Sequence, residues 1–350
     1  MISIEDIKKL VRPNIRQLCP YSTARDEFGG KLGLFLDANE SPYPTGWNRY
    51  PDPRQKELKA RIAEINGIDA SGIFLGNGSD EAIDLIFRIF CIPGKDNVVA
   101  ISPSYGMYAV SADINDIELR KVLLNEDFSL NAERLLAACD GNTKAIFLCS
   151  PNNPTGNAFP QETICRVLEG FGGIVVVDEA YIDFCESGGM IRETGRHPNL
   201  VVLRTFSKAR GMAALRLGTA FSNPYVISLM SMVKYPYNIN AETQRLALEA
   251  LKQPVDAQVR EIVAQRKMLE EALPQFSCIR KVYPSNANFI LVKADDADGM
   301  YDFLISRGII VRNRSRMDLC EGCLRITVGL PEENKKLLKA IEEYEKGDIR

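Results

Sequence analysis

The stretch that decides the fold is Leu203–Gly218, LRTFSKARGMAALRLG, which directly follows the apolar residues 200–202. It places Ser207, Lys208 and Arg216 in a glycine- and alanine-rich turn after a buried strand. A lysine can form a Schiff base with an aldehyde, and a serine and an arginine beside it can hold a phosphate. Because pyridoxal phosphate carries both groups, the stretch predicts a site for this cofactor.

The composition is that of an ordinary soluble protein. The chain has 350 residues, room for two domains, and a net charge of −3 without a basic block that would indicate a nucleic-acid or membrane partner. It shows neither a secretory signal nor an apolar run of about 18 residues. Its nine cysteines, an odd number, favour free thiols in a reducing cytoplasm. A single histidine and one CxxC do not predict a metal site.

The apolar pattern divides the chain into three parts. Residues 1–48 are rich in turn formers and predict an arm that packs on another surface. Residues 49–255 alternate apolar runs with helical stretches, which predicts an α/β domain around a mostly parallel sheet. Residues 256–350 predict a smaller α+β domain. The expected strands are 73–75, 97–101, 119–124, 144–149, 173–180, 200–205 and 218–222, followed by 281–283, 289–293, 309–312 and 324–328.

Two loops at expected strand ends carry polar groups that face a ligand site. In Gly76–Glu81, GNGSDE, Ser79 is expected to cap the helix that begins at Asp80, and the exposed N–H groups of that helix can bind a phosphate. In Ser150–Gly156, SPNNPTG, Asn153 can donate a hydrogen bond into the site. An ordinary helix cap and a structural turn are the alternative interpretations of these two loops.

A carboxylate ends the most apolar run of the chain, Val175–Tyr181, VVVDEAY. Such a group is costly to bury without a partner, and the ring nitrogen of pyridoxal phosphate supplies one for Asp178. The pairing raises the pKa of that nitrogen, and the protonated ring then withdraws electrons. Tyr181 can bond the phenolic oxygen of the ring, whereas Glu179 is expected to be structural.

Lys208 needs a lowered pKa to act as a base. A lysine ordinarily titrates near pH 10.4, and burial together with Arg216 would lower that value. The neutral amine could then move a proton between the substrate's Cα and the cofactor's C4′. A surface lysine near a strand end is the alternative.

Two arginines of the second domain, Arg312 in IIVRNRS and Arg325 in CLRITVG, end or interrupt apolar runs. Arginine in such a place captures a carboxylate or phosphate, or it forms an internal salt bridge. His197, in the turn-like HPN, is interpreted as a loop residue.

Taken together, these motifs resemble the fold-type I pyridoxal-phosphate aminotransferases, the aspartate aminotransferase-like family. The order GNGSDE, SPNNPTG, VVVDEAY, TFSK-x7-R and LRITVG spans most of the chain and is jointly specific. PYSTARDEF, DANESPYP, NRYPDP, VKYPYNIN and IIVRNRS resemble the members that act on histidinol phosphate. The resemblance implies that family's fold, with a large domain around a mostly parallel sheet and a small α+β C-terminal domain. The chain departs from the family pattern at Ala214, at Arg210 and in NESP.

The resemblance also implies roles for individual residues. The expected cofactor contacts are Lys208 (attachment), Asp178 (ring nitrogen), Asn153 and Tyr181 (phenolic oxygen), Tyr105 (ring stacking), and Ser79, Asp80, Ser207 and Arg216 (phosphate). It implies a homodimer with shared active sites, in which Tyr50 reaches the partner subunit's cofactor phosphate. The expected substrate-site residues are Tyr21, Asn39, Arg312, Arg325 and, across the dimer, Tyr237.

The implied reaction transfers an amino group from glutamate to imidazole-acetol phosphate, giving histidinol phosphate and 2-oxoglutarate, as in histidine biosynthesis. Two arginines that fork onto either a carboxylate or a phosphate satisfy both substrates. The same motifs are also compatible with a threonine-phosphate decarboxylase-like lyase and with an aromatic amino acid aminotransferase. A non-catalytic regulatory module is a further alternative, and the intact Lys208 argues against it.

Overall fold

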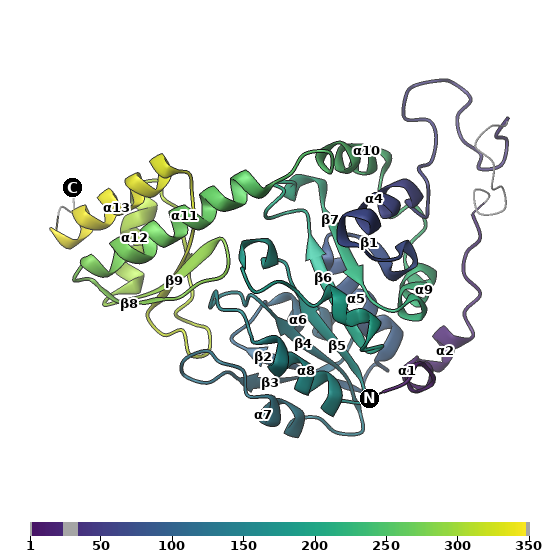
Figure 1. The fold of residues 1–350 in the computed structure, drawn as a ribbon, viewed down its shortest axis with the longest axis horizontal. Coiled ribbons are helices and arrows are strands. Elements are labelled where there is room, and N and C mark those ends of the chain that lie inside the picture. Colours follow the sequence, from purple (N-terminus) through teal and green to yellow (C-terminus); the bar gives the residue numbers. More distant parts are fainter. Residues whose placement is uncertain (1, 24–33, 348–350) are drawn as a thin grey trace.

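The larger of two sheets has seven strands in the computed structural model, which describes residues 2–23 and 34–347. The strands are β1 (Ile73–Asn77), β2 (Asn97–Ser102), β3 (Glu118–Leu123), β4 (Thr143–Cys149), β5 (Ile174–Asp178), β6 (Leu200–Thr205) and β7 (Leu217–Phe221). They lie in the order β1-β7-β6-β5-β4-β2-β3 (Figure 1). Neighbours from β6 to β3 run parallel, and β7 runs antiparallel to β6 and β1. The predicted mostly parallel sheet is confirmed.

Helices cover both faces of this sheet because its central strands are apolar on both sides. Val175 and Val177 of β5 belong to one buried cluster and Val176 to the other. The first cluster includes residues of α4 (Lys56–Asn66), α7 (Ala132–Ala137), α8 (Gln161–Gly170) and α10 (Ala241–Ala250). The second includes residues of α5 (Ser79–Phe90), α6 (Met107–Ile114) and α9 (Pro224–Val233). With both faces covered, the carboxyl ends of the strands are where side chains can meet a ligand.

The smaller sheet is antiparallel and has its own core. Its strands, in the order β10-β11-β9-β8, are β10 (Arg312–Asn313), β11 (Cys323–Thr327), β9 (Phe289–Ala294) and β8 (Ile279–Tyr283). The helices α11 (Asp256–Ala272), α12 (Ala297–Ser306) and α13 (Pro331–Glu345) pack on it through Leu269, Met300 and Ile341. Long helix α11 joins this part to the rest of the chain (Figure 1). The small α+β part expected from the sequence is therefore present.

One expected strand differs from the observed one. The apolar residues 309–312 were predicted to form a strand, but β10 pairs with β11 only at Arg312 and Asn313. The buried Val311 packs in the core of the small sheet, and Ile310 is 74% exposed. The apolar residues before Arg312 therefore do not pair in the sheet, and Val311 is apolar because it packs in the core. For this reason the apolar pattern placed the start of the strand too early.

The first residues of the predicted arm are part of the main body. Helices α1 (Ile4–Leu10) and α2 (Pro13–Arg16) bury Ile7 and Ile15, and Val11 between them, in the cluster that contains α5. The described residues from 34 to 50 instead run away from the body and are largely exposed (Figure 1). Most of the PYSTARDEF segment lies outside the described residues.

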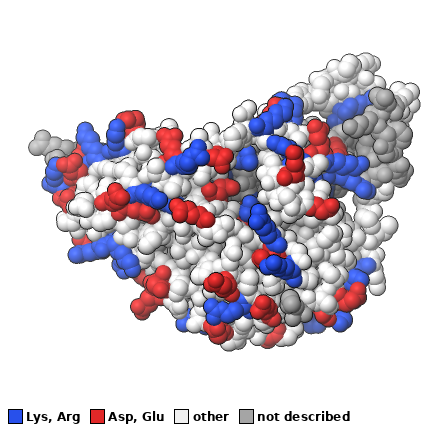
Figure 2. Space-filling model, viewed as in Figure 1, with Lys and Arg blue, Asp and Glu red and all other residues white. Residues whose placement is uncertain are grey.

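The surface is mixed in charge. On the face drawn in Figure 2, basic and acidic side chains are interspersed, as expected from the small net charge. None of the helices in the described part of the chain combines the length and apolar character that crossing a membrane requires.

Candidate active site

Asp178, the last residue of β5, is 3% exposed. Its carboxylate accepts a hydrogen bond from the Tyr108 hydroxyl at 3.0 Å and another from the Ala180 N–H at 3.1 Å. Burial nevertheless raises the pKa of Asp178 to about 6, because these two neutral donors only partly replace water. Neither donor carries a positive charge, so the site is suited to a cationic group.

Tyr108 is the contact that sequence reasoning missed. Its phenol is 1% exposed, and burial together with Asp178 raises its pKa, so it stays a neutral donor. The available signal was its spacing. Tyr108 lies in the first turn of α6, shortly after Ser104 and Tyr105 in the segment that follows β2. No motif marked it, because its partner lies 70 residues away.

Lys208 lies in the turn after β6, beside the strand that Asp178 ends. Burial lowers the pKa of Lys208, and the guanidinium groups of Arg325 and Arg216 lower it further, against the opposing charge of Asp178. Its Nζ lies 5.5 Å from the centre of the Tyr181 ring. The amine is therefore easier to deprotonate than an ordinary lysine, as the sequence predicted.

The turn that carries Lys208 is held by its own backbone. The Ser207 N–H donates to the Thr205 hydroxyl at 3.1 Å, and the Gly211 N–H donates to the Lys208 carbonyl at 3.0 Å. The turn closes where the Phe206 N–H donates to the Leu217 carbonyl at 3.0 Å. These bonds fix Ser207 and Lys208 at the carboxyl edge of the large sheet.

The amino end of α5 meets Arg216 at the same edge. An Arg216 Nη lies 3.3 Å from the Asp80 carboxylate, which also accepts a 3.0 Å hydrogen bond from the Tyr105 hydroxyl. A Cβ on Gly218 would lie 2.1 Å from the Ser79 nitrogen, and one on Gly78 would lie 2.6 Å from Arg216. Both glycines therefore let β7 and Arg216 approach the first N–H groups of the helix.

Ser79 does not cap this helix, contrary to the sequence prediction. The helix begins at Ser79 itself, and Gly78 takes the N-cap position with φ of 76°. That backbone conformation is costly for a residue with a side chain and easy for glycine. Because Ser79 does not bond its own helix as a cap, its hydroxyl is available to a ligand at the helix end.

Asn153 and Arg325 join the small sheet to the large one. The Arg325 guanidinium donates to the Asn153 side-chain oxygen and lies 5.1 Å from the centre of the Phe289 ring. Its Nε is buried without a hydrogen-bond partner. Burial lowers the pKa of Arg325, and the positive charges of Arg314 and Arg312 lower it further. Three guanidinium groups therefore lie close together here.

Four predicted site residues are not brought to Lys208 by the contacts within this chain. Tyr50 stacks on Tyr237 with ring centres 4.4 Å apart, and Tyr50 lines a hollow that also contains Asn39. Tyr21 is 74% exposed and lines a different hollow of about 490 Å³. The sequence assigned Tyr50 and Tyr237 to a site shared with a second subunit, whereas Tyr21 and Asn39 were expected to line the substrate site.

Two further charged residues, Glu179 and Arg210, lie near the site. Glu179 is 2% exposed, pairs with Arg204 at 2.9 Å and accepts from the Met190 N–H, as its predicted structural role requires. Arg210 lies 5.8 Å from the centre of the Phe206 ring. Burial lowers the pKa of Arg210 while Asp183 and Asp256 oppose the shift. Arg210 is thus near enough to acids of the loop after β5 and of the first turn of α11 to feel their charge, but its Nη1 is buried without a hydrogen-bond partner among the described residues.

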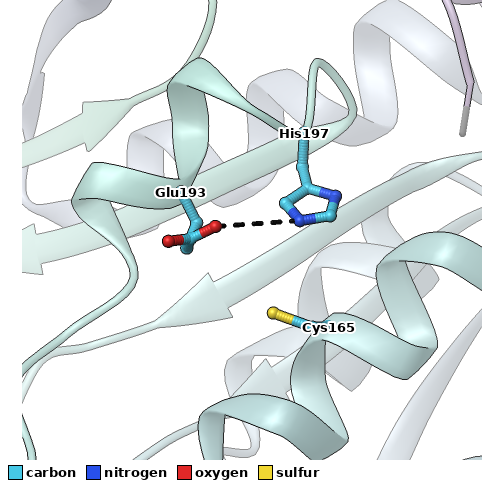
Figure 3. A group of neighbouring side chains, drawn as sticks. All are labelled: Cys165, Glu193 and His197. Carbon is cyan, nitrogen blue, oxygen red and sulfur yellow. Dashed lines mark ion pairs between the residues drawn. The ribbon is translucent and has the colours of Figure 1, made fainter.

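A second group of polar side chains lies at the opposite end of β6. Cys165 of α8, Glu193 and His197 point toward one another, with their potential ligand atoms within 4.8 Å (Figure 3). Glu193 already pairs with His197 at 3.8 Å and with Arg196 at 3.4 Å. Glu193 thus contacts both His197 and Arg196, and His197 lies in a loop as predicted.

The chemistry of the donors fits pyridoxal phosphate. A buried carboxylate whose two observed hydrogen-bond donors are neutral, a lysine with a lowered pKa and a helix end beside an arginine lie along one edge of the sheet. A carboxylate pairs with a protonated ring nitrogen, and a helix end with an arginine suits a phosphate. This arrangement can hold a molecule with an aldehyde, a basic ring nitrogen and a phosphate.

Comparisons with known proteins agree with this geometry. The sequence model of aminotransferases of class I and II matches residues 38–341. A histidinol-phosphate aminotransferase of Parabacteroides distasonis is 53% identical over 341 residues, covering 97% of this chain and 99% of the relative. The one from Bacteroides fragilis is 51% identical, covering 98% and 100%.

Solved structures share the fold. That of the histidinol-phosphate aminotransferase of Clostridium acetobutylicum has a TM-score of 0.80 at 24% identity, covering 86% of this chain and 92% of that one. The enzyme of Sinorhizobium meliloti, solved in complex with pyridoxal-5'-phosphate, has a TM-score of 0.79 at 24% identity, covering 89% and 90%. At this identity the likeness supports the fold alone.

Proposed function

The chain belongs to the class I and II aminotransferases, and we propose that it uses pyridoxal phosphate to exchange the amino group of histidinol phosphate with 2-oxoglutarate. The observation that carries the reaction type is the edge on which Lys208, Asp178 and the end of α5 meet. The substrates are supported by relatives of that name that are half identical over nearly the full length of both chains. Histidine biosynthesis in the cytoplasm is the setting in which such an enzyme works.

Pyridoxal phosphate, when bound, supplies the carbonyl that takes up an amino group and the electron-withdrawing ring that stabilises negative charge at the substrate's Cα. In this chain Lys208 would hold its carbonyl carbon and Asp178 its ring nitrogen. Ser79, Ser207, Arg216 and the backbone at Asp80 would hold its phosphate, with Asn153 and Tyr181 at the phenolic oxygen and Tyr105 on the ring face.

Lys208 moves the proton. Burial and the nearby arginines Arg325 and Arg216 lower the pKa of its amine, which increases the neutral fraction that can accept a proton from the substrate's Cα. The turn fixed by Gly211 keeps the amine at the carboxyl edge of the sheet. The same amine could deliver the proton to the cofactor's C4′ instead of returning it to Cα. That choice of carbon distinguishes transamination from racemisation.

Asp178 stabilises positive charge in the site. Its carboxylate is buried, and Tyr108 and the Ala180 N–H orient its oxygens without neutralising them. A cation next to Asp178 lowers the pKa of this carboxyl from about 6 and keeps it ionised. The residue therefore favours a protonated ring over a neutral one.

Arg325 and Arg312 bind the anionic end of the substrate. They face one another across the β10–β11 ladder, and Arg325 also contacts Asn153 beside the cofactor position. A guanidinium binds a carboxylate or a phosphate through two parallel hydrogen bonds. One pocket can thus take glutamate in one half-reaction and histidinol phosphate in the other.

The working form is a homodimer with shared active sites. Large apolar side chains are exposed on the arm, including Tyr21 (74%), Leu36 (83%) and Trp47 (68%). Side chains of this size are rarely left open together in a stable monomer. A second subunit that covers the arm would bring Tyr50, Tyr237, Tyr21 and Asn39 toward the site.

The deciding experiment compares three amino donors with the purified holoenzyme. Histidinol phosphate, phenylalanine and phosphothreonine are each offered with 2-oxoglutarate, and both glutamate and carbon dioxide are measured. The proposal expects glutamate from histidinol phosphate at a kcat/KM at least tenfold above that of phenylalanine, without carbon dioxide. Carbon dioxide from phosphothreonine without transamination would instead show a lyase, and a preference for phenylalanine would show an aromatic aminotransferase.

A further inference from the structure

A third arginine, Arg314, lies on the same face as the two predicted substrate arginines. Arg312 and Arg325 are directly paired across the β10–β11 ladder, so their side chains share one face. Residues two apart on an extended strand also share a face. The Arg314 N–H donates to the Cys323 carbonyl at 2.8 Å and continues the ladder. The sequence RNR therefore sets Arg314 beside Arg312 on the side that carries Arg325.

Arg314 has no anionic partner within the described residues. Its Nε is buried without a hydrogen bond, and no described carboxylate pairs with the guanidinium. The neighbouring groups that could carry an opposing negative charge are Cys320 and Tyr181. Burial raises the pKa of Cys320 to about 12 and raises the pKa of Tyr181, so both groups are neutral near pH 7. A half-buried guanidinium without an anion is expensive unless a ligand supplies one.

The three arginines also repel one another. Arg314 and Arg312 both lower the pKa of Arg325, and Arg312 lowers that of Arg314. Two guanidinium groups match one carboxylate with its single negative charge. A phosphate monoester carries about two negative charges above its second pKa, near pH 6, and presents three acceptor oxygens. The positive charge of the three arginines thus exceeds what one carboxylate of glutamate requires, and it suits the dianionic phosphate of a phosphate monoester.

We propose that Arg314 completes a three-arginine subsite that selects the dianionic phosphate of histidinol phosphate over a carboxylate. The inference rests on the proposed function and deepens it, since it assigns substrate choice to a residue outside the recognised motifs. Arg325 and Arg312 bind both the carboxylate of glutamate and the phosphate of histidinol phosphate. Arg314 contacts only the phosphate, which is larger than a carboxylate and carries a second negative charge. Arg314 is in this sense a specificity-determining residue.

The test uses Arg314→Gln and Arg314→Lys holoenzymes, with Arg260→Gln as the control. Arg260 is an exposed residue of α11, so its substitution removes one positive charge from the same part of the molecule without touching the cluster. Each half-reaction is followed separately. Arg314→Gln should lower kcat/KM for histidinol phosphate about 10- to 100-fold and that for glutamate less than threefold. Arg314→Lys should retain part of the preference, and Arg260→Gln should leave both unchanged.

The pH profile separates phosphate recognition from a structural role. In the unchanged enzyme, kcat/KM for histidinol phosphate relative to glutamate should fall as the pH drops below about 6, where the phosphate gains a proton. Arg314→Gln should flatten that ratio. Equal losses for both substrates, or an unaltered pH dependence of the ratio, would overturn the proposal.

Calorimetric titration with inorganic phosphate tests the three-arginine subsite independently of the proposed function. The unchanged holoenzyme, whose cofactor phosphate position is filled, should bind inorganic phosphate more tightly than Arg314→Gln by at least tenfold. If histidinol phosphate is not a substrate and this difference is still found, the proposed function fails and the subsite stands. Equal phosphate affinity in the two proteins would reject the subsite whatever the substrate.

Discussion

At the scale of the residue, Lys208 and Asp178 account for most of the proposed chemistry, and the fold shifts the pKa of each in the direction that its role requires. Burial and nearby arginines lower the pKa of Lys208, whereas burial raises that of Asp178 to about 6. The first shift increases the neutral amine that can act as a base, and the second leaves a carboxylate that gains from a cationic partner.

Replacing Lys208 with alanine should remove the base and the attachment point together. We expect kcat to fall by at least about 10³-fold, at the upper part of the range for loss of a general base. The absorbance of the covalently held cofactor should disappear while the circular dichroism stays unchanged. Lys234→Ala, at the end of α9, is the matched control, and activity that survives in Lys208→Ala would remove the assigned role.

Replacing Asp178 with asparagine should raise the free energy of unfolding of the apoprotein and lower the activity of the holoenzyme. The folded chain keeps a proton on Asp178 up to a pH of about 6, which the unfolded chain loses near 3.8. The free energy of unfolding therefore falls as the pH rises through that window, by about 3 kcal/mol in total. Asparagine avoids this cost, so the apoprotein's melting temperature at pH 7.5 should rise by a few degrees, and by about half as much at pH 5.

In the same variant, kcat of the holoenzyme should drop on the order of 10²-fold or more, because a neutral amide does not stabilise the ring's positive charge. Differential scanning fluorimetry and steady-state rates measure the two effects. Asp302→Asn, an exposed change in α12, should alter neither. A lower apoprotein melting temperature at pH 7.5 would contradict the assigned cost of the unpaired carboxylate.

At the scale of the element, the contact between β7 and the first turn of α5 shapes the predicted phosphate site. Gly78 supplies the positive φ at the helix start, and Gly218 supplies the space next to the Ser79 nitrogen. The strands were predicted to within a few residues because their apolar runs are long and buried on both faces. The start of α5 and the position of β10 were missed because glycine geometry and packing set them, not periodicity.

Gly218→Ala should disturb both stability and cofactor binding. The new Cβ would lie 2.1 Å from the Ser79 nitrogen and 2.3 Å from the Gly78 carbonyl carbon, so the helix start must shift. We expect a loss of about 2 kcal/mol in the free energy of unfolding, typical of overpacking, and a cofactor Kd at least tenfold higher. Gly141→Ala, where nothing lies within 4 Å, is the control for urea unfolding and cofactor titration. Unchanged cofactor affinity in Gly218→Ala would show that this contact does not form the site.

At the scale of the whole molecule, the site predicted from the sequence is only partly assembled by one chain. Lys208, Tyr181, Asp178 and Arg325 lie at the carboxyl edge of the large sheet or beside it, whereas Tyr50 and Tyr237 stack on each other near the exposed arm. The homodimer we propose would supply the missing contacts from the second subunit.

Hybrid dimers test that arrangement directly. Tyr50→Ala and Lys208→Ala chains, each of low activity alone, are refolded together from denaturant. If Tyr50 acts across the interface, each hybrid has one site with an intact Lys208 and an intact Tyr50 from its partner. Activity should then rise to about a quarter of the unchanged enzyme, because half of the dimers are hybrids with one complete site. No gain on mixing would place Tyr50 in its own subunit's site or outside both.

The sequence by itself determined the α/β architecture, the family and the lysine, aspartate and arginine motifs, because these depend on local periodicity and on residues close together in the chain. Only the tertiary structure decided that Tyr108 holds Asp178, that Arg314 joins Arg312 and Arg325, and that Arg210 lies near enough to Asp183 and Asp256 to feel their charge. Those contacts join positions up to tens of residues apart. Their physical basis is burial, which removes water from charged groups and makes them depend on whichever partners the fold brings near.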